Sequence, residues 1–119
     1  MNCLFCDIAA GRVPSENVFE SDEIVAFRDI NPQAPVHILV IPKTHIDGVG
    51  AVDGSHVGLL GRLILAAVEI SRSESLTEDG FRLAVNQGRD GGQTVGHLHV
   101  HLLGGRQIDR KSTRLNSSH

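Results

Sequence analysis

The segment from His97 to Leu103 reads His-Leu-His-Val-His-Leu-Leu, so histidine alternates with aliphatic residues. Successive side chains of a β-strand point to opposite faces of a sheet. This order therefore predicts a strand with three imidazoles on one face and aliphatic side chains on the other. Such a strand requires a sheet that is covered on its apolar side and carries a polar site on the opposite side. We expect the strand to span residues 96–103.

The rest of the body predicts an α+β fold whose strands are mostly antiparallel. A nearly continuous β-branched run before Pro42 is typical of a central strand. Apolar residues between Ser55 and Arg72 recur at helical spacing. The predicted elements are a short helix over 4–10, a hairpin of strands 18–20 and 24–27, a central strand over 36–41, a long helix over 55–72, and strands over 81–86 and 96–103.

The length and charge of the chain limit its class of partner. At 119 residues it is long enough for one domain and too short for two of ordinary size. A formal charge of -3, scattered basic residues and the lack of Trp and Tyr argue against long nucleic acid as a partner. No apolar run approaches the length of a membrane span, and the N-terminus lacks the features of a secretion signal. We therefore expect a cytoplasmic protein that acts on a small ligand and binds no membrane.

Residues 109–119 differ from the rest of the chain. The stretch is polar, has neither helical nor strand periodicity, and follows a pair of glycines. Its order also resembles the direct translation of a synthetic sequencing adapter. We therefore expect 109–119 to be a disordered, non-native tail and 1–108 to be the domain. Without that tail, eight basic and thirteen acidic residues give the body a charge of -5.

Strand geometry limits what the three histidines can do together. Alternate residues lie roughly 6.6 Å apart, so His97 and His101 are about 13 Å apart, too far for one metal ion to bind all three. Two neighbours could share an ion, which would make a catalytic zinc site with an open water position. A row of imidazoles also suits a phosphate, because one neutral imidazole can attack phosphorus while a neighbour donates a hydrogen bond or a proton.

A glycine-rich loop over 87–94 precedes the histidine row. Gly88, Gly91 and Gly92 let backbone N–H groups approach an anion, and Thr94 adds a hydroxyl donor. The same glycines are compatible with an ordinary hairpin turn, and it is the neighbouring histidines that favour an anion site. Asn86, which ends the preceding strand, is a further candidate for the same pocket.

These motifs resemble the histidine triad nucleotide-binding proteins, whose signature alternates histidine with apolar residues as 97–103 does. The similarity also covers 27–37, 41–43, 86–88, 91–94 and 104–107, which span nearly the whole body. The resemblance implies a five-stranded antiparallel sheet with two helices, paired into a homodimer with a larger sheet. The apolar arc of the long helix is wider than one small sheet needs, which agrees with a partner subunit.

The resemblance also implies an activity, namely hydrolysis of a purine nucleoside phosphoramidate or a related nucleotide linked at its α-phosphate. The reaction would pass through a nucleotidyl-histidine intermediate on His99 and would require no cofactor for catalysis. His101 and His37 would contact phosphate and assist proton transfer. The α-phosphate would be held by Asn86, Gly92, Thr94 and the backbone N–H of Val95, and the ribose hydroxyls by Asp29. The base pocket would be lined by Leu4, Phe5, Ile8, Phe27 and Ile30, which could equally be core residues.

Cys3 and Cys6 form a Cys-x-x-Cys pair, which is half of a four-ligand zinc site. Bacterial relatives with this pair also have the histidine of Pro-Lys-x-His, here His45. The resemblance therefore implies a structural zinc ion held by Cys3, Cys6, His45 and His97. Two buried thiols on an amphipathic helix remain the simpler interpretation. A redox pair is disfavoured because no thioredoxin-like pattern surrounds the cysteines.

Three functions are compatible with these features. The first is a nucleotide hydrolase or transferase that acts through His99. The second is a zinc-dependent hydrolase in which two histidines of the row bind the ion, and the third is a nucleotide-responsive binding protein whose hydrolysis is incidental. One departure from the family concerns its C-terminal segment, which usually contains aromatic residues and proline and reaches the partner's site. Residues 109–119 do not match that segment.

Overall fold

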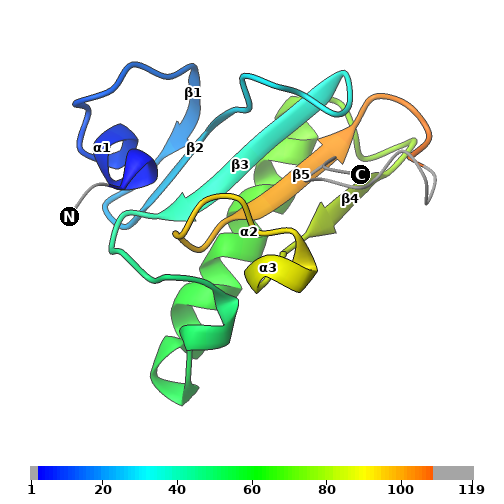
Figure 1. Ribbon diagram of the computed structural model, residues 1–119. Coiled ribbons are helices and arrows are strands. Elements are labelled where there is room, and N and C mark those ends of the chain that lie inside the picture. The colour runs from blue at the N-terminus through cyan, green and yellow to red at the C-terminus, as the bar shows by residue number, and fades with distance from the viewer. Residues whose placement is uncertain (1–2, 109–119) are drawn as a thin grey trace.

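A five-stranded antiparallel sheet forms the centre of the computed structural model (Figure 1). The structure describes residues 3–108, and the predicted tail over 109–119 lies outside the described residues. The strand order is β1-β2-β3-β5-β4, and the predicted α+β architecture with one short and one long helix is confirmed. The elements are α1 (Leu4–Ala9), β1 (Asn17–Glu20), β2 (Ile24–Arg28), β3 (Val36–Pro42), the 3-10 turns η1 (Val49–Ala51) and η2 (Gly54–His56), α2 (Val57–Ser73), β4 (Phe81–Ala84), α3 (Gly88–Gly91) and β5 (Val100–Gly104).

The register between the two central strands decides which face the histidines occupy. β3 pairs with β5 so that Leu39 lies opposite His101 and His37 lies opposite Leu103. Directly opposite residues of an antiparallel pair project to the same face, and so do residues two apart on one strand. His37 and His101 therefore lie on one face of the sheet as diagonal neighbours.

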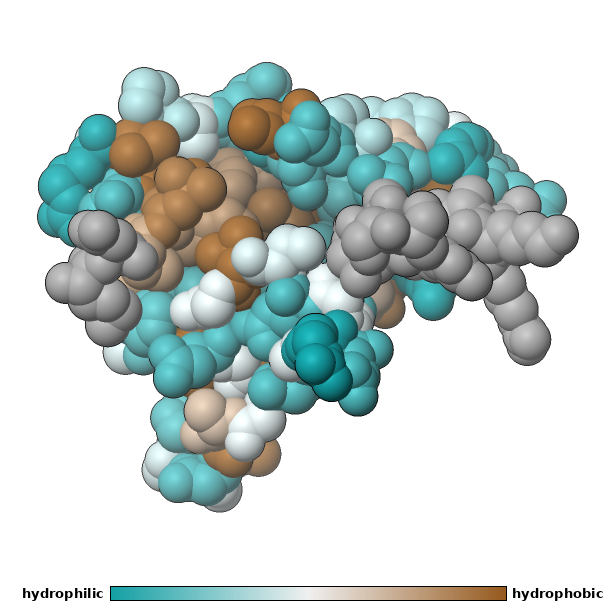
Figure 2. Space-filling view, viewed as in Figure 1, coloured by the Kyte–Doolittle hydropathy of each residue, from teal (hydrophilic) through white to brown (hydrophobic). Residues whose placement is uncertain are grey.

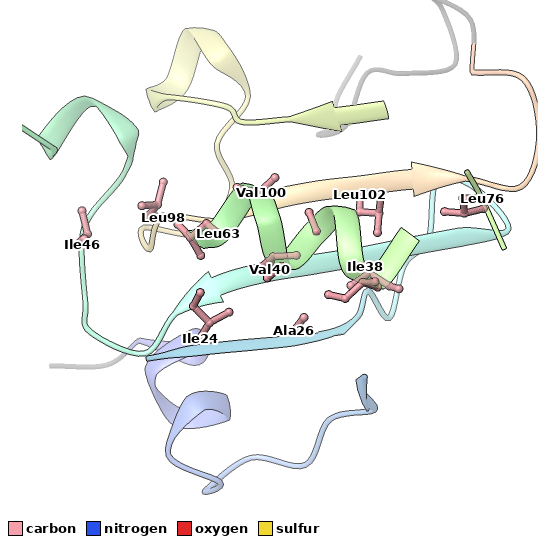
Figure 3. Close-up of a cluster of buried hydrophobic side chains, with 13 residues drawn as sticks. Ile24, Ala26, Ile38, Val40, Ile46, Leu63, Leu76, Leu98, Val100 and Leu102 are labelled. Atoms are coloured by element: carbon pink, nitrogen blue, oxygen red, sulfur yellow. The ribbon is translucent and has the colours of Figure 1, made fainter. Parts of the chain in front are cut away.

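The other face of the sheet packs against α2 and forms the main hydrophobic core. Ile38 and Val40 of β3, and Leu102 of β5, share this core with Leu63 of α2 (Figure 3). Each fully buried side chain of this size contributes about 2 kcal/mol through the hydrophobic effect. The histidine side of the sheet is thus free to carry polar groups while this layer supplies stability.

A capping box precedes the long helix α2. The Asp53 carboxylate accepts a hydrogen bond from the Ser55 backbone N–H at 2.8 Å, and His56 Nδ1 accepts one from the Asp53 N–H at 3.0 Å. These bonds satisfy N–H groups that a helical start leaves free. His56 therefore has a structural role as part of this cap, and it is distant in sequence from the histidine row.

α2 is also apolar on part of its outer surface. By length and composition Gly54–Ser73 could cross a membrane, with a mean hydropathy of 1.2, so the expectation that no apolar run approaches that length is wrong. One such helix is weak evidence for a membrane span, because the core helix of a globular protein passes the same test. Here Leu63, Ala67 and Ile70 pack against the sheet, as in such a core helix.

The histidine side of the sheet carries α1 and a second hydrophobic cluster. Phe5 and Ile8 of α1 pack on Phe27, Leu39 and Ile41 of the sheet. In the view of Figure 2, hydrophobic residues gather around a hollow beside the N-terminal part of the chain, while hydrophilic residues cover most of the remaining surface. The cluster is smaller than the α2 core and borders the site described below.

β5 begins later than predicted, at Val100 instead of residue 96. Continuing the register would place Leu98 opposite Pro42, which has no N–H to donate to the ladder. The Leu98 N–H instead donates to the carbonyl of Ile46 at 2.6 Å. Leu98 and Val100 nevertheless lie in the α2 core, so the predicted alternation of faces persists beyond the end of the regular strand.

The glycine-rich loop contains one helical turn, α3, where only a loop was predicted. Gly88 and Gly92 flank this turn with φ angles of 68° and 83°, in the left-handed region that favours glycine. β4 ends at Ala84, so Asn86 lies just beyond the strand and before the turn. The glycines therefore shape the approach to the histidine row.

Candidate active site and metal cluster

A cavity of about 300 Å³ opens on the histidine side of the sheet, and both His99 and His101 lie on its wall. A larger and more open groove of about 560 Å³ lies between the β1–β2 turn and α2, but no described histidine lines it. The chemistry of the lining therefore identifies the smaller cavity as the candidate site, which we call the triad cavity. Of the predicted nucleotide-binding residues, those on its wall are Leu4, Phe5, Ile8, Phe27, Asp29, Ile30, Thr94 and Val95.

Two predicted phosphate-binding residues and one predicted histidine do not line the triad cavity. Gly92 borders an adjoining hollow that shares Thr94 with it, and Asn86 lies on neither wall. His37 is buried behind His101 and does not reach the wall. Any effect of His37 on a ligand in the cavity must therefore pass through His101 or Asp29, which lie beside it and line the wall.

His99 is held in a single tautomer by the backbone. Its Nδ1 lies 2.7 Å from the carbonyl oxygen of His97. A carbonyl oxygen only accepts, so Nδ1 carries the hydrogen and Nε2 carries the lone pair. His99 therefore presents an unprotonated nitrogen from the wall of the triad cavity, which is the form a nucleophile requires.

His37 and His101 form a hydrogen-bonded pair whose tautomers are also fixed. The backbone N–H of Gln33 donates to His37 Nδ1 at 3.0 Å, which leaves the proton of neutral His37 on Nε2. That Nε2 lies 3.0 Å from His101 Nδ1 and donates to it. The proton of neutral His101 is therefore on Nε2, and the cavity contains one imidazole that accepts and one that donates.

Burial keeps these histidines neutral. It lowers the pKa of His99, against the opposing effects of its bond to the His97 carbonyl and of the Asp29 carboxylate. Burial also lowers the pKa of His37, although the nearby Asp29 charge raises it. For His101, burial together with charge repulsion from His99 and His37 lowers the pKa to about 3. These three imidazoles are therefore uncharged at neutral pH.

One side of the triad cavity is apolar and is built around Phe5. The Phe5 ring makes edge-to-face contacts with Phe27 at 5.4 Å and with His99 at 5.2 Å between ring centroids. Phe5, Ile8 and Phe27 are buried and serve both the second core and the cavity wall. Ile30 is 89% exposed, so core packing does not explain it. An exposed isoleucine at the edge of a cavity is suited to covering the flat face of a base.

The polar side of the cavity is formed by Asp29 and by the segment that carries Thr94 and Val95. One carboxylate oxygen of Asp29 accepts from the Asn31 N–H at 2.9 Å, and the other lies 3.5 Å from His37 Nε2. The Asp29 carboxylate is thus fixed at the cavity wall beside the histidine pair. Such a group accepts hydrogen bonds from hydroxyls of a ligand.

Gln93 fixes the shape of the glycine-rich loop. Its Oε1 accepts from the Gly88 N–H at 2.8 Å, and its Nε2 donates to the carbonyls of Asp47 at 2.7 Å and Val95 at 3.0 Å. These bonds join both ends of the loop to the segment that follows β3. Gln93 therefore positions Thr94 and Val95 without lining the triad cavity itself.

A second cluster of polar side chains lies beside the cavity and contains Cys3, Cys6, His45 and His97, as the sequence predicts for a metal site. Their ligand atoms all lie within 4.8 Å of one another. Nδ1 of His97 is 3.3 Å from Cys3 Sγ and 3.6 Å from Cys6 Sγ, and Nδ1 of His45 is 3.3 Å from Cys6 Sγ. Tetrahedral zinc with ordinary bond lengths separates its sulfur and nitrogen ligands by about 3.6 Å. The four side chains therefore fit a tetrahedral metal ion, and we call them the Cys/His cluster.

Both histidines of the Cys/His cluster direct a lone pair into it. His97 Nε2 donates to the Pro42 carbonyl at 2.8 Å, and His45 Nε2 donates to an Asp47 carboxylate oxygen at 2.7 Å. Nδ1 of each ring is therefore free to bind a metal, and such outer partners are usual for metal-binding histidines. Burial would raise the pKa of the Cys3 thiol, but hydrogen bonds with Cys6, His45 and the Phe5 backbone outweigh it and lower that pKa. Burial and the neighbouring Cys3 raise the pKa of the Cys6 thiol, so Cys3 is the thiol of the pair that more readily becomes the metal-binding thiolate.

The HIT domain family matches residues 10–108 of the sequence. The chain belongs to the HIT family. A relative from Escherichia coli (strain K12), the purine nucleoside phosphoramidase, is 48% identical over 105 residues, which cover 88% of each chain. The 14 kDa zinc-binding protein of Zea mays is 45% identical over 108 residues, covering 89% of this HIT protein and 84% of its own length. A HIT family hydrolase from Legionella pneumophila Philadelphia 1 has the same fold, with a TM-score of 0.91 and 48% identity over 93% of this chain and 99% of its own.

Several residues of this HIT site were not predicted from the sequence. The triad cavity is also lined by Val13, Pro14, Ser15, Arg28, Asn31 and Leu39. The tautomers of His37 and His99 depend on the backbone of Gln33 and His97, and a backbone group leaves no signal in residue type. Asp47 was detectable in principle, because a carboxylate two residues after a metal-binding histidine is a common outer partner.

Proposed function

We propose that this HIT protein hydrolyses purine nucleoside phosphoramidates, or related nucleotides linked at the α-phosphate, through a nucleotidyl intermediate on His99. The observation that carries the proposal is the hydrogen bond from His99 Nδ1 to the His97 carbonyl, which leaves Nε2 unprotonated on the wall of the triad cavity. The name of the Escherichia coli relative supports the substrate class. A nucleotide-sized cavity with an apolar and a polar side supports it independently.

In the first step, the lone pair of His99 Nε2 attacks phosphorus and the bond from phosphorus to the leaving nitrogen breaks. In the tautomer fixed by the His37–His101 hydrogen bond, His101 Nε2–H donates a hydrogen bond to the anionic phosphate or to the leaving nitrogen. The departing amine takes its proton from solvent, so neither imidazole of the pair gives up its only proton. The His97 carbonyl stabilises the positive charge that develops on the His99 ring through the Nδ1–H bond.

In the second step, water attacks phosphorus and the bond to His99 Nε2 breaks. The attacking water loses its proton to solvent, and the electron pair of the broken bond returns to His99 Nε2. His37 acts through His101, since it lies behind that ring and does not line the triad cavity. Its fixed Nε2–H keeps the acceptor side of His101 occupied and aims the opposite nitrogen at the substrate.

The remaining parts of the nucleotide are proposed to bind to the two sides of the cavity. Leu4, Phe5, Ile8, Phe27 and Ile30 take the base, and Asp29 accepts the ribose hydroxyls. Thr94 and the backbone N–H of Val95 take the α-phosphate beside His99. Gly92 borders the adjoining hollow and acts on phosphate from the edge of the site, whereas Asn86 lines neither cavity and has no phosphate contact in this assignment.

The test of this proposal is a quenched reaction with adenosine phosphoramidate, followed by mass spectrometry of the peptide that contains His99. We expect a nucleotidyl adduct on that peptide in the unaltered protein and none in His99→Ala. His56→Gln is the matched control, because His56 caps a 3-10 turn and does not line the triad cavity. Undiminished turnover in His99→Ala would reject the proposal.

A metal-dependent reaction is the second candidate, and one observation favours it. Asp29, His37 and His101 bring three ligand atoms within 4.8 Å of one another beside the cavity. An ion held there would activate water for attack on phosphorus. Complete removal of metal from folded protein, assayed at saturating substrate, decides between the candidates, because emptying the Cys/His cluster is expected to weaken binding more than the chemical step. Loss of hydrolysis together with loss of the His99 adduct, both restored by zinc, would favour the metal-dependent reaction.

We also propose that a structural zinc ion occupies the Cys/His cluster. The fit of the ligand spacing and the two outward hydrogen bonds of the histidines support it, as does the name of the Zea mays relative. The ion would neutralise the thiolates and cross-link α1 to the sheet. Cys3 and Cys6 are free thiols in the structure, which suits a reducing compartment and agrees with a cytoplasmic location.

The expected assembly is a homodimer formed by residues 1–108. Val57 and Leu65 of α2 are 74% and 62% exposed, and Ile64 beside them is also exposed. β4 is an edge strand of the sheet and offers unpaired backbone groups. A second copy that covers both features would extend the sheet. Light scattering of the unaltered protein and of Leu65→Glu checks this proposal, and an unaltered protein that is monomeric at high concentration contradicts it.

A further inference from the structure

The short helix α1 contributes to two sites at once. Cys3 caps its start and accepts from the Cys6 N–H at 3.3 Å, and both thiols face His97 and His45. Leu4, Phe5 and Ile8 of the same segment line the triad cavity. Residues three or four apart share one face of a helix, so the two thiols lie on one face while Leu4 and Ile8 lie on another. α1 is thus the wall between the Cys/His cluster and the proposed base pocket.

Few other contacts hold α1 against the rest of the protein. It is six residues long, and a helix of that length is not stable alone. Its hydrogen bonds to parts of the described chain beyond residue 13 all run through Cys3 and Cys6, to His45 and His97. The remaining attachment is the apolar contact of Phe5 and Ile8 with the sheet. The Cys/His cluster is therefore the polar anchor of this wall.

The cluster also reaches the nucleophile. His97 places its Nδ1 among the thiols, and its own carbonyl oxygen accepts from His99 Nδ1 at 2.7 Å. The ring of Phe5 lies between them, with edge-to-face contacts to His97 at 5.9 Å and to His99 at 5.2 Å. A shift of His97 or α1 would therefore displace both the base wall and the orientation of His99.

We propose that occupancy of the Cys/His cluster by a thiophilic divalent cation sets nucleotide affinity, because the filled cluster holds α1 as the base wall of the triad cavity. This inference rests on the proposed function for the identity of the ligand. The metal-binding side chains are then positioning residues for nucleotide, in addition to any part they play in stability. The effect is strongest on binding of the base and weaker on the chemical step.

His45 provides the sharpest test, because it binds in the cluster but does not belong to α1 or line the triad cavity. We expect His45→Ala to lose tightly bound zinc and to bind AMP about tenfold more weakly by calorimetry. His45→Cys restores a set of four ligands, three cysteines and one histidine, which zinc accepts. This variant should recover both tightly bound zinc and the affinity for AMP. Amide exchange over 4–10 should accelerate in His45→Ala, while exchange in the middle of α2 stays slow.

Ile70→Val controls for a loss of stability alone. Ile70 lies in the core on the opposite side of the sheet, and its truncation costs about 1 kcal/mol. We expect this variant to have a lower Tm and an unchanged Kd for AMP. An AMP Kd in His45→Ala within twofold of the unaltered protein, measured on samples shown to be folded and zinc-free, would overturn the inference.

The outcomes separate this inference from the proposed function. Zinc-loaded protein that binds AMP but does not hydrolyse adenosine phosphoramidate would reject the proposed activity, and the His45 comparison would still decide the inference. Zinc-loaded protein that hydrolyses the substrate, with an unchanged AMP Kd in zinc-free His45→Ala, would reject the inference alone. If zinc-free His45→Ala does not fold at 25 °C, Cys6→His takes its place, because this variant keeps four ligands. It should bind zinc fully and have the AMP Kd of the unaltered protein. A weaker AMP affinity in fully zinc-loaded Cys6→His would overturn the inference.

Discussion

The two faces of the sheet differ in what they bury. Under α2, the core consists of aliphatic side chains such as Ile38, Leu63 and Leu102, and the buried polar residue of α2, Ser71, bonds to its own helix. On the α1 side, the other four buried polar residues among those that the structure describes are histidines, and each has a hydrogen-bond partner. The comparison indicates that the α2 side of the sheet supplies most of the stability, while the α1 side carries the groups for chemistry. A substitution on one side should therefore change either the free energy of unfolding or the activity, with little effect on the other quantity.

The largest expected effect is on the chemical face. His99→Ala removes the nucleophile, so kcat/KM for adenosine phosphoramidate should fall by about 10⁴-fold or more. The free energy of unfolding should fall by only about 1 kcal/mol, because the His97 carbonyl loses its donor and Phe5 loses a ring contact. Steady-state kinetics and urea unfolding measure the two quantities. A stable variant with kcat/KM reduced less than tenfold would contradict the division between the faces.

The next effect is on the apolar face. Leu63→Ala should lower the free energy of unfolding by about 3 kcal/mol, since Leu63 is fully buried and its truncation leaves a cavity. The Kd for AMP, measured at a temperature where the variant is folded, should not change. A parallel loss of AMP affinity would show that the two faces are mechanically coupled through β3 and β5.

Acid should destabilise the histidine face. The ordinary pKa of histidine is 6.5, and burial with repulsion from neighbouring histidines lowers the pKa of His101 to about 3 in the folded protein. Below pH 6.5 the unfolded chain therefore binds a proton that the folded chain excludes, and the free energy of unfolding falls as the pH falls. At pH 5 the contribution of His101 to this loss is about 2 kcal/mol. Urea unfolding at pH 7 and pH 5 should show a smaller loss in His101→Gln, and equal losses would show that other groups cause the sensitivity.

The smallest effect is expected at Gln93, which supports the phosphate side from outside the cavity. Gln93→Ala removes three hydrogen bonds that shape the loop, so KM should rise about tenfold while kcat changes by less than about threefold. Gln107→Ala is the matched control, because Gln107 is exposed and does not line the triad cavity. A fall in kcat without a change in KM would instead assign Gln93 to the chemical step.

The parts of this molecule that were predictable depend on side-chain type and local periodicity. The alternation of 97–103 identified the histidine face. The Cys-x-x-Cys pair indicated half of a metal site, and the resemblance to the histidine triad family supplied His45 and His97, which the fold brings beside Cys3 and Cys6. The end of the β5 ladder was missed because it depends on which residue of β3 comes opposite, and that residue is Pro42. Helix α3 was missed because a segment of four residues that begins and ends with glycine has no measurable periodicity.

The hydrogen-bond network of the histidines was not predictable for a different reason. Its fixed points are the N–H of Gln33 and the carbonyls of His97 and Pro42. Every residue carries a carbonyl and nearly every residue an N–H, so only the folded geometry shows which of them meets an imidazole. The three histidines of the row are evenly spaced in the sequence, so only the folded structure shows that their roles differ.

The exposure of Ile30 and Leu4 at the triad cavity has a calorimetric consequence. The two side chains are 89% and 50% exposed, so apolar surface at the rim is hydrated in the empty protein. A purine that covers this surface returns ordered water to bulk solvent, and removal of apolar area from water lowers the heat capacity. The enthalpy of AMP binding should therefore become steadily more favourable with rising temperature, with a shallower slope once Ile30 is replaced by serine.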